Sequence, residues 1–219
     1  MRSRLLFAGR QEDGFKWSND IRSWQIPSAG QTVQKWRCSM RELSMHILDI
    51  AQNSIAAGAR LVQIDVVEDV ANDMMTISVT DDGRGMSEEV VQRVGDPFVT
   101  SRTTRRVGLG IPLLAAAAER CGGGVEIVSK QNVGSKVTAQ FQLSHIDRAP
   151  LGNMAETLLV LVACNPDLDF VYNHLRGDSS FHLDTREIRS ELGSIPLSHP
   201  EVVAFIRDFV AEGERTMGA

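Results

Sequence analysis

The chain has 219 residues, of which 42% are apolar, so it is long enough for one ordinary domain or a compact domain with an extension. A formal net charge of −5 argues against a broad surface for nucleic acid or for an anionic membrane. The three cysteines are widely spaced and odd in number, which argues against a disulfide framework or a metal cluster and favours a reducing, cytoplasmic setting.

The first 39 residues differ in composition from the rest of the chain. They contain all three tryptophans, Trp17, Trp24 and Trp36, and they show no clear helical or strand period. We expect an irregular N-terminal extension over residues 1–39, which is either genuine or the product of a start codon placed too early. A strongly patterned segment begins at Met40.

From Met40 onward the hydrophobic pattern alternates between the periods of helices and strands. Alternation with period two predicts strands over residues 61–68, 74–80, 125–129 and 136–143. Helical periodicity and capping residues predict helices over 43–57 and 111–121, a helix start at 87–89 and a loop over 95–107. The fold class that follows is α+β, a two-layer sandwich in which a mostly antiparallel, four-stranded sheet carries helices on one face. We assign this domain to residues 40–144.

Residues 145–219 read as a second, small α+β piece. Its longest strongly apolar run, 157–164, is far too short to span a bilayer. The expected elements are helices over 154–164, 185–192 and 200–212 and short strands near 170–172 and 180–183. Nothing in it has the pattern of a catalytic site, so we expect a C-terminal accessory region that contacts a partner.

Lysine usage excludes two common nucleotide-binding classes. The four lysines are Lys16, Lys35, Lys130 and Lys136, and none lies between Met40 and Ser129. A phosphate-binding P-loop needs Gly-Lys-Ser/Thr, and the protein-kinase fold needs a lysine on a strand. A Rossmann site is also disfavoured, because no strand directly precedes the glycines near residue 110 and the third glycine is missing.

A different glycine pattern follows the second predicted strand. The segment from Asp81 to Gly85 reads Asp-Asp-Gly-Arg-Gly, and its glycines permit backbone conformations that a flat ligand can approach closely. The carboxylate of Asp81 could accept a hydrogen bond from an exocyclic amine such as that of adenine. The alternative is an ordinary turn, since Asp and Gly dominate turns.

A second glycine pair, Gly108-Leu109-Gly110, precedes the helix predicted over 111–121. The free backbone N–H groups and the dipole at a helix start form an anion site. Arg102 and its arginine neighbours just upstream would reinforce a bound phosphate, although the same residues also fit a solvated basic loop.

The first predicted helix places Asp49 and Asn53 on one face, because they are four residues apart. An amide oxygen at Asn53 could complete the shell of a magnesium ion held by phosphates. The carboxylate of Asp49 could then orient or deprotonate a water molecule. The alternative is a solvated polar stripe. His46 lies almost on this stripe and is expected to pack or to form a hydrogen bond.

The order and spacing of these motifs resemble the GHKL superfamily of gyrase, heat-shock-chaperone, histidine-kinase and mismatch-repair ATP-binding domains. Five segments carry the resemblance, at residues 46–59, 81–86, 96–102, 108–111 and 134–137. The resemblance implies the Bergerat fold and binding of ATP with Mg²⁺.

The resemblance also implies roles for single residues. Asn53 would bind magnesium, Asp81 would recognise the adenine amine, and Gly83 and Gly85 would lie under the base. The mobile lid over the phosphates would begin at Phe98, Thr100, Ser101 and Arg102. The triphosphate would contact Gly108, Leu109 and Gly110, and the hydroxyl of Ser135 would lie near the adenine-recognising carboxylate.

Four departures from the family pattern bear on activity. Asp49 stands where hydrolysing members have glutamate, which is one methylene longer, so activation of water could be slow or absent. Arg106 replaces the first glycine of the phosphate loop. The lid between Phe98 and Gly108 is short, and Ala56 replaces an aspartate of gyrase-like and mismatch-repair members. The last two departures favour the kinase-like branch.

The composition of the two end segments bears on which branch of the superfamily the chain resembles. The residues after 143 contain no lysine to reach a γ-phosphate, and the first 39 contain no histidine to be phosphorylated. The motifs from Met40 and in the tail, such as Asp169-Phe-Val-Tyr172, resemble stand-alone bacterial ATP-binding proteins often encoded near iron-only hydrogenase genes.

Three hypotheses follow from these observations. The first is a cytoplasmic Mg-ATP-dependent regulatory protein kinase, of the serine or histidine type, or a slow ATPase, with Asp49 as the catalytic residue and an unidentified partner protein as phosphoacceptor in trans. The second is a non-catalytic adenine-nucleotide sensor whose ATP-ordered lid controls a partner. The third is a structural α+β scaffold.

Overall fold

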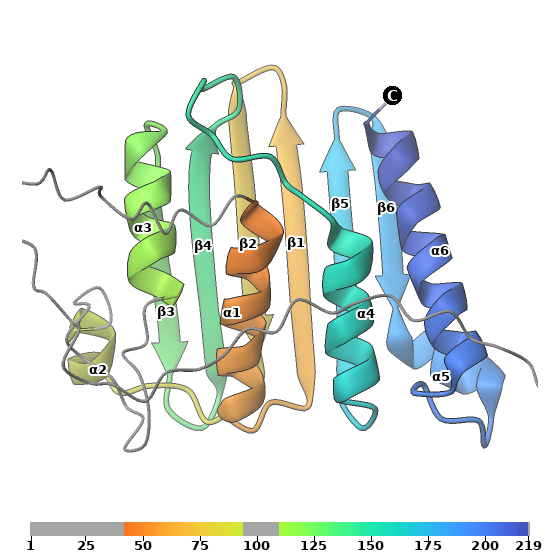
Figure 1. Ribbon diagram of the computed structural model, residues 1–219. Coiled ribbons are helices and arrows are strands. Elements are labelled where there is room, and N and C mark those ends of the chain that lie inside the picture. Colours follow the sequence, from red (N-terminus) through yellow and green to blue (C-terminus); the bar gives the residue numbers. More distant parts are fainter. Residues whose placement is uncertain (1–41, 94–109, 219) are drawn as a thin grey trace, which may run out of the picture. The chain divides into compact units, whose positions relative to one another are not determined.

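The structure is a computed structural model that describes residues 42–93 and 110–218 (Figure 1). The strands in chain order are β1 (Leu61–Asp69), β2 (Met74–Asp81), β3 (Gly124–Lys130), β4 (Gly134–Gln142), β5 (Asp169–Arg176) and β6 (Ser179–Asp184). The helices are α1 (Leu43–Ala56), α2 (Glu88–Arg93), α3 (Gly110–Arg120), α4 (Met154–Cys164), α5 (Thr185–Leu192) and α6 (Pro200–Met217). None of the helices described here is long and apolar enough to cross a membrane.

All six strands form one sheet, in the order β3-β4-β2-β1-β5-β6. Every pairing is antiparallel except β1 with β5, which is parallel. The predicted α+β class with a mostly antiparallel sheet is confirmed. The four strands predicted for this sheet are all present, but the expectation that the sheet has only these four is wrong, because β5 pairs along the free edge of β1 and β6 then pairs with β5. The assignment of residues 40–144 and 145–219 to separate domains stays a prediction, although the sheet runs across that boundary.

The core lies between the sheet and the helices that cover one of its faces. Figure 1 shows α1, α3, α4 and α6 in front of the sheet. Alternate residues of the central strands point toward them, and Val62, Ile64 and Val66 of β1 are each 0% exposed. Apolar residues at helical spacing on α1, such as Leu43 and Ile47, are buried against this face. The apolar residues of the strands, which recur every two residues, therefore pack against those of the helices, which recur about every 3.6 residues, in one hydrophobic layer.

Helix α4 carries the chain to the parallel strand β5, which requires a crossover rather than a tight turn. Its bounds match the prediction because its start is marked by a cap: Asn153 accepts a hydrogen bond from the backbone N–H of Glu156 at 3.0 Å. One flank of α4 packs on α6, and Leu158 and Leu161 are almost fully buried.

Helix α6 extends to Met217, five residues beyond the predicted end. The added length brings Gly213 under the ring of Phe181, where a Cβ atom would overlap the ring. It also brings Glu214 to the buried side chains of β5. The phenolic O–H of Tyr172 donates to Glu214 Oε1 at 2.7 Å, and His174 Nδ1 lies 3.0 Å from the same oxygen.

Across the sheet, the other ring nitrogen of His174, Nε2, lies 3.4 Å from Glu68 Oε1. Burial alone would lower the pKa of His174, but its hydrogen bond to Glu214 and its close contact with the carboxylate of Glu68 raise the pKa to about 9. The imidazolium form of His174 therefore joins β1, β5 and α6. We call His174, Glu68 and Glu214 the His174 cluster.

Candidate functional site

The predicted site residues that the structure describes gather where α1, the loop after β2 and the start of α3 meet. Gly110 begins α3 directly beside α1, since a Cβ atom built on it would lie 3.2 Å from the Cβ atom of Asp49. A glycine at this position lets the backbone of α3 approach α1 closely. The first N–H groups of α3 therefore lie near the Asp49 end of the site.

Asp81 is the last residue of β2, and both of its carboxylate oxygens are held in place. Ser54 Oγ of α1 donates to Oδ2 at 2.8 Å, and the backbone N–H of Gly83 donates to Oδ1 at 2.9 Å. The side chain is half-buried. Each carboxylate oxygen accepts more than one hydrogen bond, so the fixed carboxylate can still accept from a ligand.

Gly83 lies tightly between Asp81 and the end of α1. A Cβ atom there would come within 2.9 Å of Asp81 Oδ1 and 3.1 Å of the Cβ atom of Ala57. The next residue, Arg84, donates its backbone N–H to the carbonyl of Ala57 at 3.0 Å. The loop after β2 is thus anchored to α1 by close backbone packing, which leaves little room for a side chain at position 83.

Gly85 has a positive φ of +62°, and a Cβ atom on it would overlap the carbonyl of Lys130 in the β3–β4 turn. From the same turn, Asn132 donates its backbone N–H to the carbonyl of Arg84 at 2.7 Å. Gly134 has a φ of +134°, and its Cβ atom would overlap the carbonyl of Asp81. The packing of the two loops is therefore sufficient to require glycine at 85 and 134, whatever ligand binds. A role for Gly85 under a base stays a prediction.

Ser135 lies directly opposite Asp81 in the register of β2 and β4. Its Oγ atom lies 2.9 Å from Ser129 Oγ, and Ser129 donates its one hydroxyl proton to the carbonyl of Gly134 at 3.0 Å. Ser135 is therefore the donor in the hydroxyl pair, and its oxygen keeps lone pairs beside the end of β2. Ser129 also accepts the backbone N–H of Met86 at 2.8 Å, which fixes the loop after Gly85.

Asp49 and Asn53 lie one turn apart on α1, with Asp49 half-buried and Asn53 exposed. His46 precedes Asp49 by one turn on the same helix and is buried in the core. Burial, followed by the charge of Arg120, lowers the pKa of His46. His46 is therefore a neutral packing residue, as one of the two sequence expectations had it, and among the described residues nothing hydrogen-bonds its Nδ1 atom.

The structure thus brings together Asp49, Asn53, Asp81, Gly83 and Gly110. Six predicted ligand contacts lie outside the described residues: Phe98, Thr100, Ser101, Arg102, Gly108 and Leu109. The predicted loop over 95–107 and Arg106 also lie outside them.

Two residues of the site were missed by the sequence analysis. Ser54 orients Asp81 and Ser129 fixes the following loop, but a serine inside a helix or a strand carries no distinctive signal of its own. Their partners are 27 and 43 residues away in the chain, so the tertiary fold was needed to find them.

Known proteins are similar to the segment of the chain that contains the motifs. Residues 40–145 match the family described as histidine kinase-, DNA gyrase B-, and HSP90-like ATPase. The chain is 25% identical over 138 residues to the sensor histidine kinase ZraS of Escherichia coli K12, covering 62% of this chain and 30% of that protein. It is 23% identical over 107 residues to a putative sensor histidine kinase NtrY-like protein of Rickettsia typhi, covering 49% and 18%.

The shared segment spans less than a third of these relatives. Another relative is sporulation kinase D of Bacillus subtilis, at 26% identity over 108 residues, 49% of this chain and 21% of that one. A solved N-terminal domain of a DNA repair protein aligns with a TM-score of 0.49 and 14% identity over 71% of this chain and 58% of that chain. Full-length ShkA in complex with AMPPNP aligns with a TM-score of 0.40 and 21% identity over 46% and 21%.

Proposed function

We propose that the chain binds Mg-ATP and uses it to regulate a partner protein, because residues 40–145 match the family described as histidine kinase-, DNA gyrase B-, and HSP90-like ATPase. The observation that carries the proposal is the carboxylate of Asp81, held by Ser54 and Gly83 at the junction of α1 and the loop after β2. A carboxylate fixed in this way is a preorganised acceptor for the exocyclic amine of adenine. Placement in the cytoplasm is part of the same proposal.

The phosphate end of the site is proposed to lie between α1 and the start of α3. The first N–H groups of α3, which have no partner within the helix itself, and the helix dipole favour a phosphate there, and Gly110 provides the close approach to Asp49. The amide oxygen of Asn53 fits a magnesium ion that phosphates already hold, because Mg²⁺ takes oxygen ligands and keeps few protein contacts. The ion would neutralise the phosphate charge. From the resemblance, Gly108, Leu109 and the lid residues are proposed to complete the contacts to ATP.

In the enzymatic form of the proposal, Asp49 is the general base. A hydroxyl or imidazole of the partner attacks the γ-phosphorus, ADP departs, and the proton of a hydroxyl acceptor passes to Asp49. With water in place of the partner group, the same step is slow ATP hydrolysis. Asp49 reaches one methylene less far than the glutamate of hydrolysing relatives, which supports slow turnover.

The same shortened carboxylate favours a second candidate, a nucleotide sensor without turnover. In that form ATP changes the surface that a partner meets, and no phosphate is transferred. Asp49→Ala distinguishes the two. An enzyme loses phosphate transfer or hydrolysis at least 10-fold while ATP binding persists, whereas a sensor has no turnover to lose.

Calorimetric titration of the full chain with ATP, with and without Mg²⁺, tests the proposal. We expect binding that strengthens with Mg²⁺ and falls at least 10-fold in Asp81→Asn, because an amide presents a donor where the adenine amine needs an acceptor. Asp178→Asn, the same change at an exposed aspartate of the β5–β6 turn, is expected to bind like wild type. Wild-type protein that binds no ATP, or equal losses in both variants, would contradict the proposal.

A further inference from the structure

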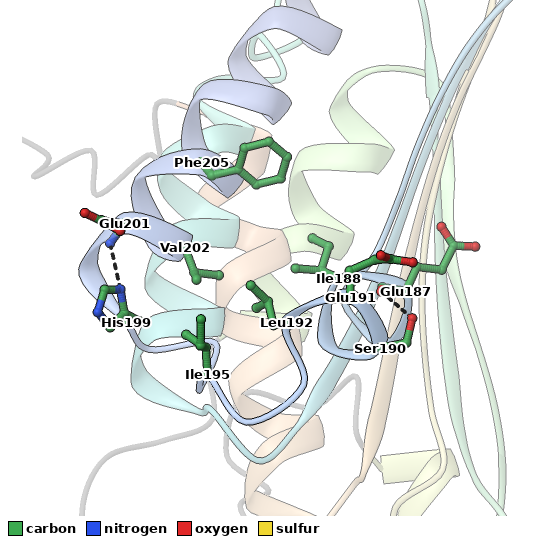
Figure 2. Close-up of a pocket in the computed structure, with 10 residues that line it drawn as sticks. All are labelled: Glu187, Ile188, Ser190, Glu191, Leu192, Ile195, His199, Glu201, Val202 and Phe205. Carbon is green, nitrogen blue, oxygen red and sulfur yellow. Dashed lines mark hydrogen bonds between the residues drawn. The ribbon is translucent and has the colours of Figure 1, made fainter.

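A groove with a volume of about 790 Å³ opens between α5, the loop that follows it and the first turns of α6 (Figure 2). This volume lies within the range of about 300–1,000 Å³ that is common for ligand-binding sites. The groove is built from different elements than the junction of α1, the β2 loop and α3. Its lining residues are Glu187, Ile188, Ser190, Glu191, Leu192, Ile195, His199, Glu201, Val202 and Phe205.

The floor of the groove is apolar and partly open. Figure 2 shows Ile188, Leu192 and Val202 facing one another from α5 and α6. Phe205 is 57% exposed and Ile195 is 45% exposed, although both are large and apolar. The apolar strip continues along α6, where the ring of Phe209 stacks on Phe205 at a centroid distance of 5.9 Å. Contiguous exposed apolar side chains of this kind mark interaction surfaces.

The rim of the groove is negatively charged. Glu187 and Glu191 lie at one side and Glu201 at the other, and the lining contains no lysine or arginine (Figure 2). None of these three glutamates forms an ion pair among the described residues. The C-terminus of α5 and the N-terminus of α6 both lie at the groove, and their opposite dipole charges offset each other, so the glutamates set the charge of the rim.

The two arginines of α5 form their ion pairs with aspartates outside the lining rather than with the rim glutamates. Arg186 binds Asp184 through both its Nε and its terminal nitrogen, and the shortest distance is 2.6 Å. Arg189 binds Asp169 at 3.0 Å. An apolar floor between unpaired carboxylates is complementary to a chain segment with apolar side chains on one face and cations beside them.

We propose that this groove docks a basic amphipathic helix of a partner protein. Apolar side chains at positions i, i+3, i+4 and i+7 of that helix fill the floor, and flanking lysines or arginines meet the rim glutamates. A second copy of this chain is a poorer fit, because symmetric pairing would bring two sets of rim carboxylates together. The inference does not depend on ATP binding, so either can fail without the other.

Fluorescence anisotropy with the full chain tests the docking. The probe is a fluorescein-labelled 18-residue helical peptide with leucine along one face, at the spacing i, i+3, i+4 and i+7, and lysine at all other positions. The matched probe has glutamate in place of every lysine. We expect the lysine peptide to bind at least 10-fold more tightly than the glutamate peptide. Comparable binding of the two peptides would overturn the proposal.

Variants locate the binding. Glu191→Lys combined with Glu201→Lys is expected to weaken binding of the lysine peptide at least 10-fold. Glu119→Lys combined with Glu126→Lys makes the same change in net charge at exposed residues of α3 and β3 and is expected to leave binding unchanged. Equal losses in both double variants would show attraction by overall charge and overturn the proposal.

The apolar floor is tested in the same way. Phe205→Ser should weaken binding at least 10-fold, whereas Val128→Ser, at a residue of β3 that is 60% exposed, should not. Circular dichroism confirms that each variant is folded. Sedimentation of the protein alone gives one more outcome, because a concentration-dependent dimer that Phe205→Ser abolishes would assign the groove to a second copy and overturn the proposal.

Discussion

At the scale of single residues, Gly85 and Gly177 form a natural pair for comparison. Their φ angles are +62° and +56°, so both lie in the left-handed region that favours glycine. A Cβ atom on Gly85 would overlap the carbonyl of Lys130, whereas a Cβ atom on Gly177 meets nothing within 4 Å. The two positions therefore separate backbone strain from close packing.

We expect Gly177→Ala to lower the free energy of unfolding by about 1 to 2 kcal/mol, the cost of left-handed backbone for an L-residue. Gly85→Ala adds the displacement of the β3–β4 turn, so its cost should exceed about 3 kcal/mol. Urea denaturation followed by circular dichroism measures both. Equal costs would mean that the loop after β2 is not clamped on that turn.

The residue types of the candidate site could be predicted, but their fixed geometry could not. Asp81 and Gly83 stand out in a sequence because carboxylates and glycines cluster there after a strand. Ser54, which orients Asp81, lies beside Asn53 on a helix where serine has no special meaning. The sequence analysis explained Gly85 by a bound adenine base, yet the close backbone contact with Lys130 already requires glycine there.

At the scale of elements, the His174 cluster couples the docking of α6 to pH. The pKa of His174 is about 9 in the folded protein and near 6.5 in an unfolded chain. A raised pKa of this kind contributes stability that is complete below about pH 6.5 and is lost as the pH rises through about 9. The groups beside the ring are Glu68 of β1, Tyr172 of β5 and Glu214 of α6, and Arg176 of β5 forms an ion pair with Glu68 at 3.4 Å.

We therefore expect the free energy of unfolding to fall by about 3 kcal/mol between pH 6.5 and 9.5, since the difference of about 2.5 pKa units corresponds to that energy. His174→Gln removes the titrating group and should flatten this fall, although it also destabilises the protein at pH 7 by leaving Glu214 without its cation, whereas Glu68 keeps Arg176. His145→Gln, at a histidine outside the cluster, should keep the wild-type slope. Chemical denaturation at several pH values provides the comparison, and parallel slopes for wild type and His174→Gln would contradict it.

Element bounds were predictable where local chemistry sets them and not where packing does. Helices α4 and α5 match their predicted ranges because Asn153 and Asp184 cap them. The last five residues of α6 were missed, since Glu214 and Met217 are held by contacts with β5 and the core. Strand β5 continues past Tyr172 through polar residues such as Asn173, whose amide donates to Asp65 of β1 at 2.7 Å.

At the scale of the whole molecule, the order of the six strands could not be deduced from local pattern. Each hairpin was visible as two runs joined by a turn, but the pairing of Leu61 with Asp169 joins parts of the chain that are far apart. Parallel pairing leaves no turn signal to identify it. The sequence therefore indicated two pieces where the structure has one continuous sheet.

The continuous sheet predicts that residues 145–219 are needed for folding. A chain that ends at Ser144 lacks both β5 and α4. The edge of β1 is then unpaired, and its buried residues Val62, Ile64 and Val66 become more exposed. We expect such a chain to aggregate or to lose most of its ellipticity, as measured by size-exclusion chromatography and circular dichroism. A chain that lacks only Gly218 and Ala219 serves as the control. A monomeric, folded product ending at Ser144 would show that the first four strands are sufficient.

The parallel pairing of β1 with β5 also delays the folding of the sheet during synthesis of the chain. Strand β1 leaves the ribosome well before its partner, because roughly a hundred residues separate Leu61 from Asp169. At synthesis rates of about 5–20 residues per second, the edge of β1 waits on the order of 5–20 s. During that interval it can pair with another nascent chain, so the yield of native protein should depend on how quickly residues 145–176 follow and on chaperones that shield the waiting strand.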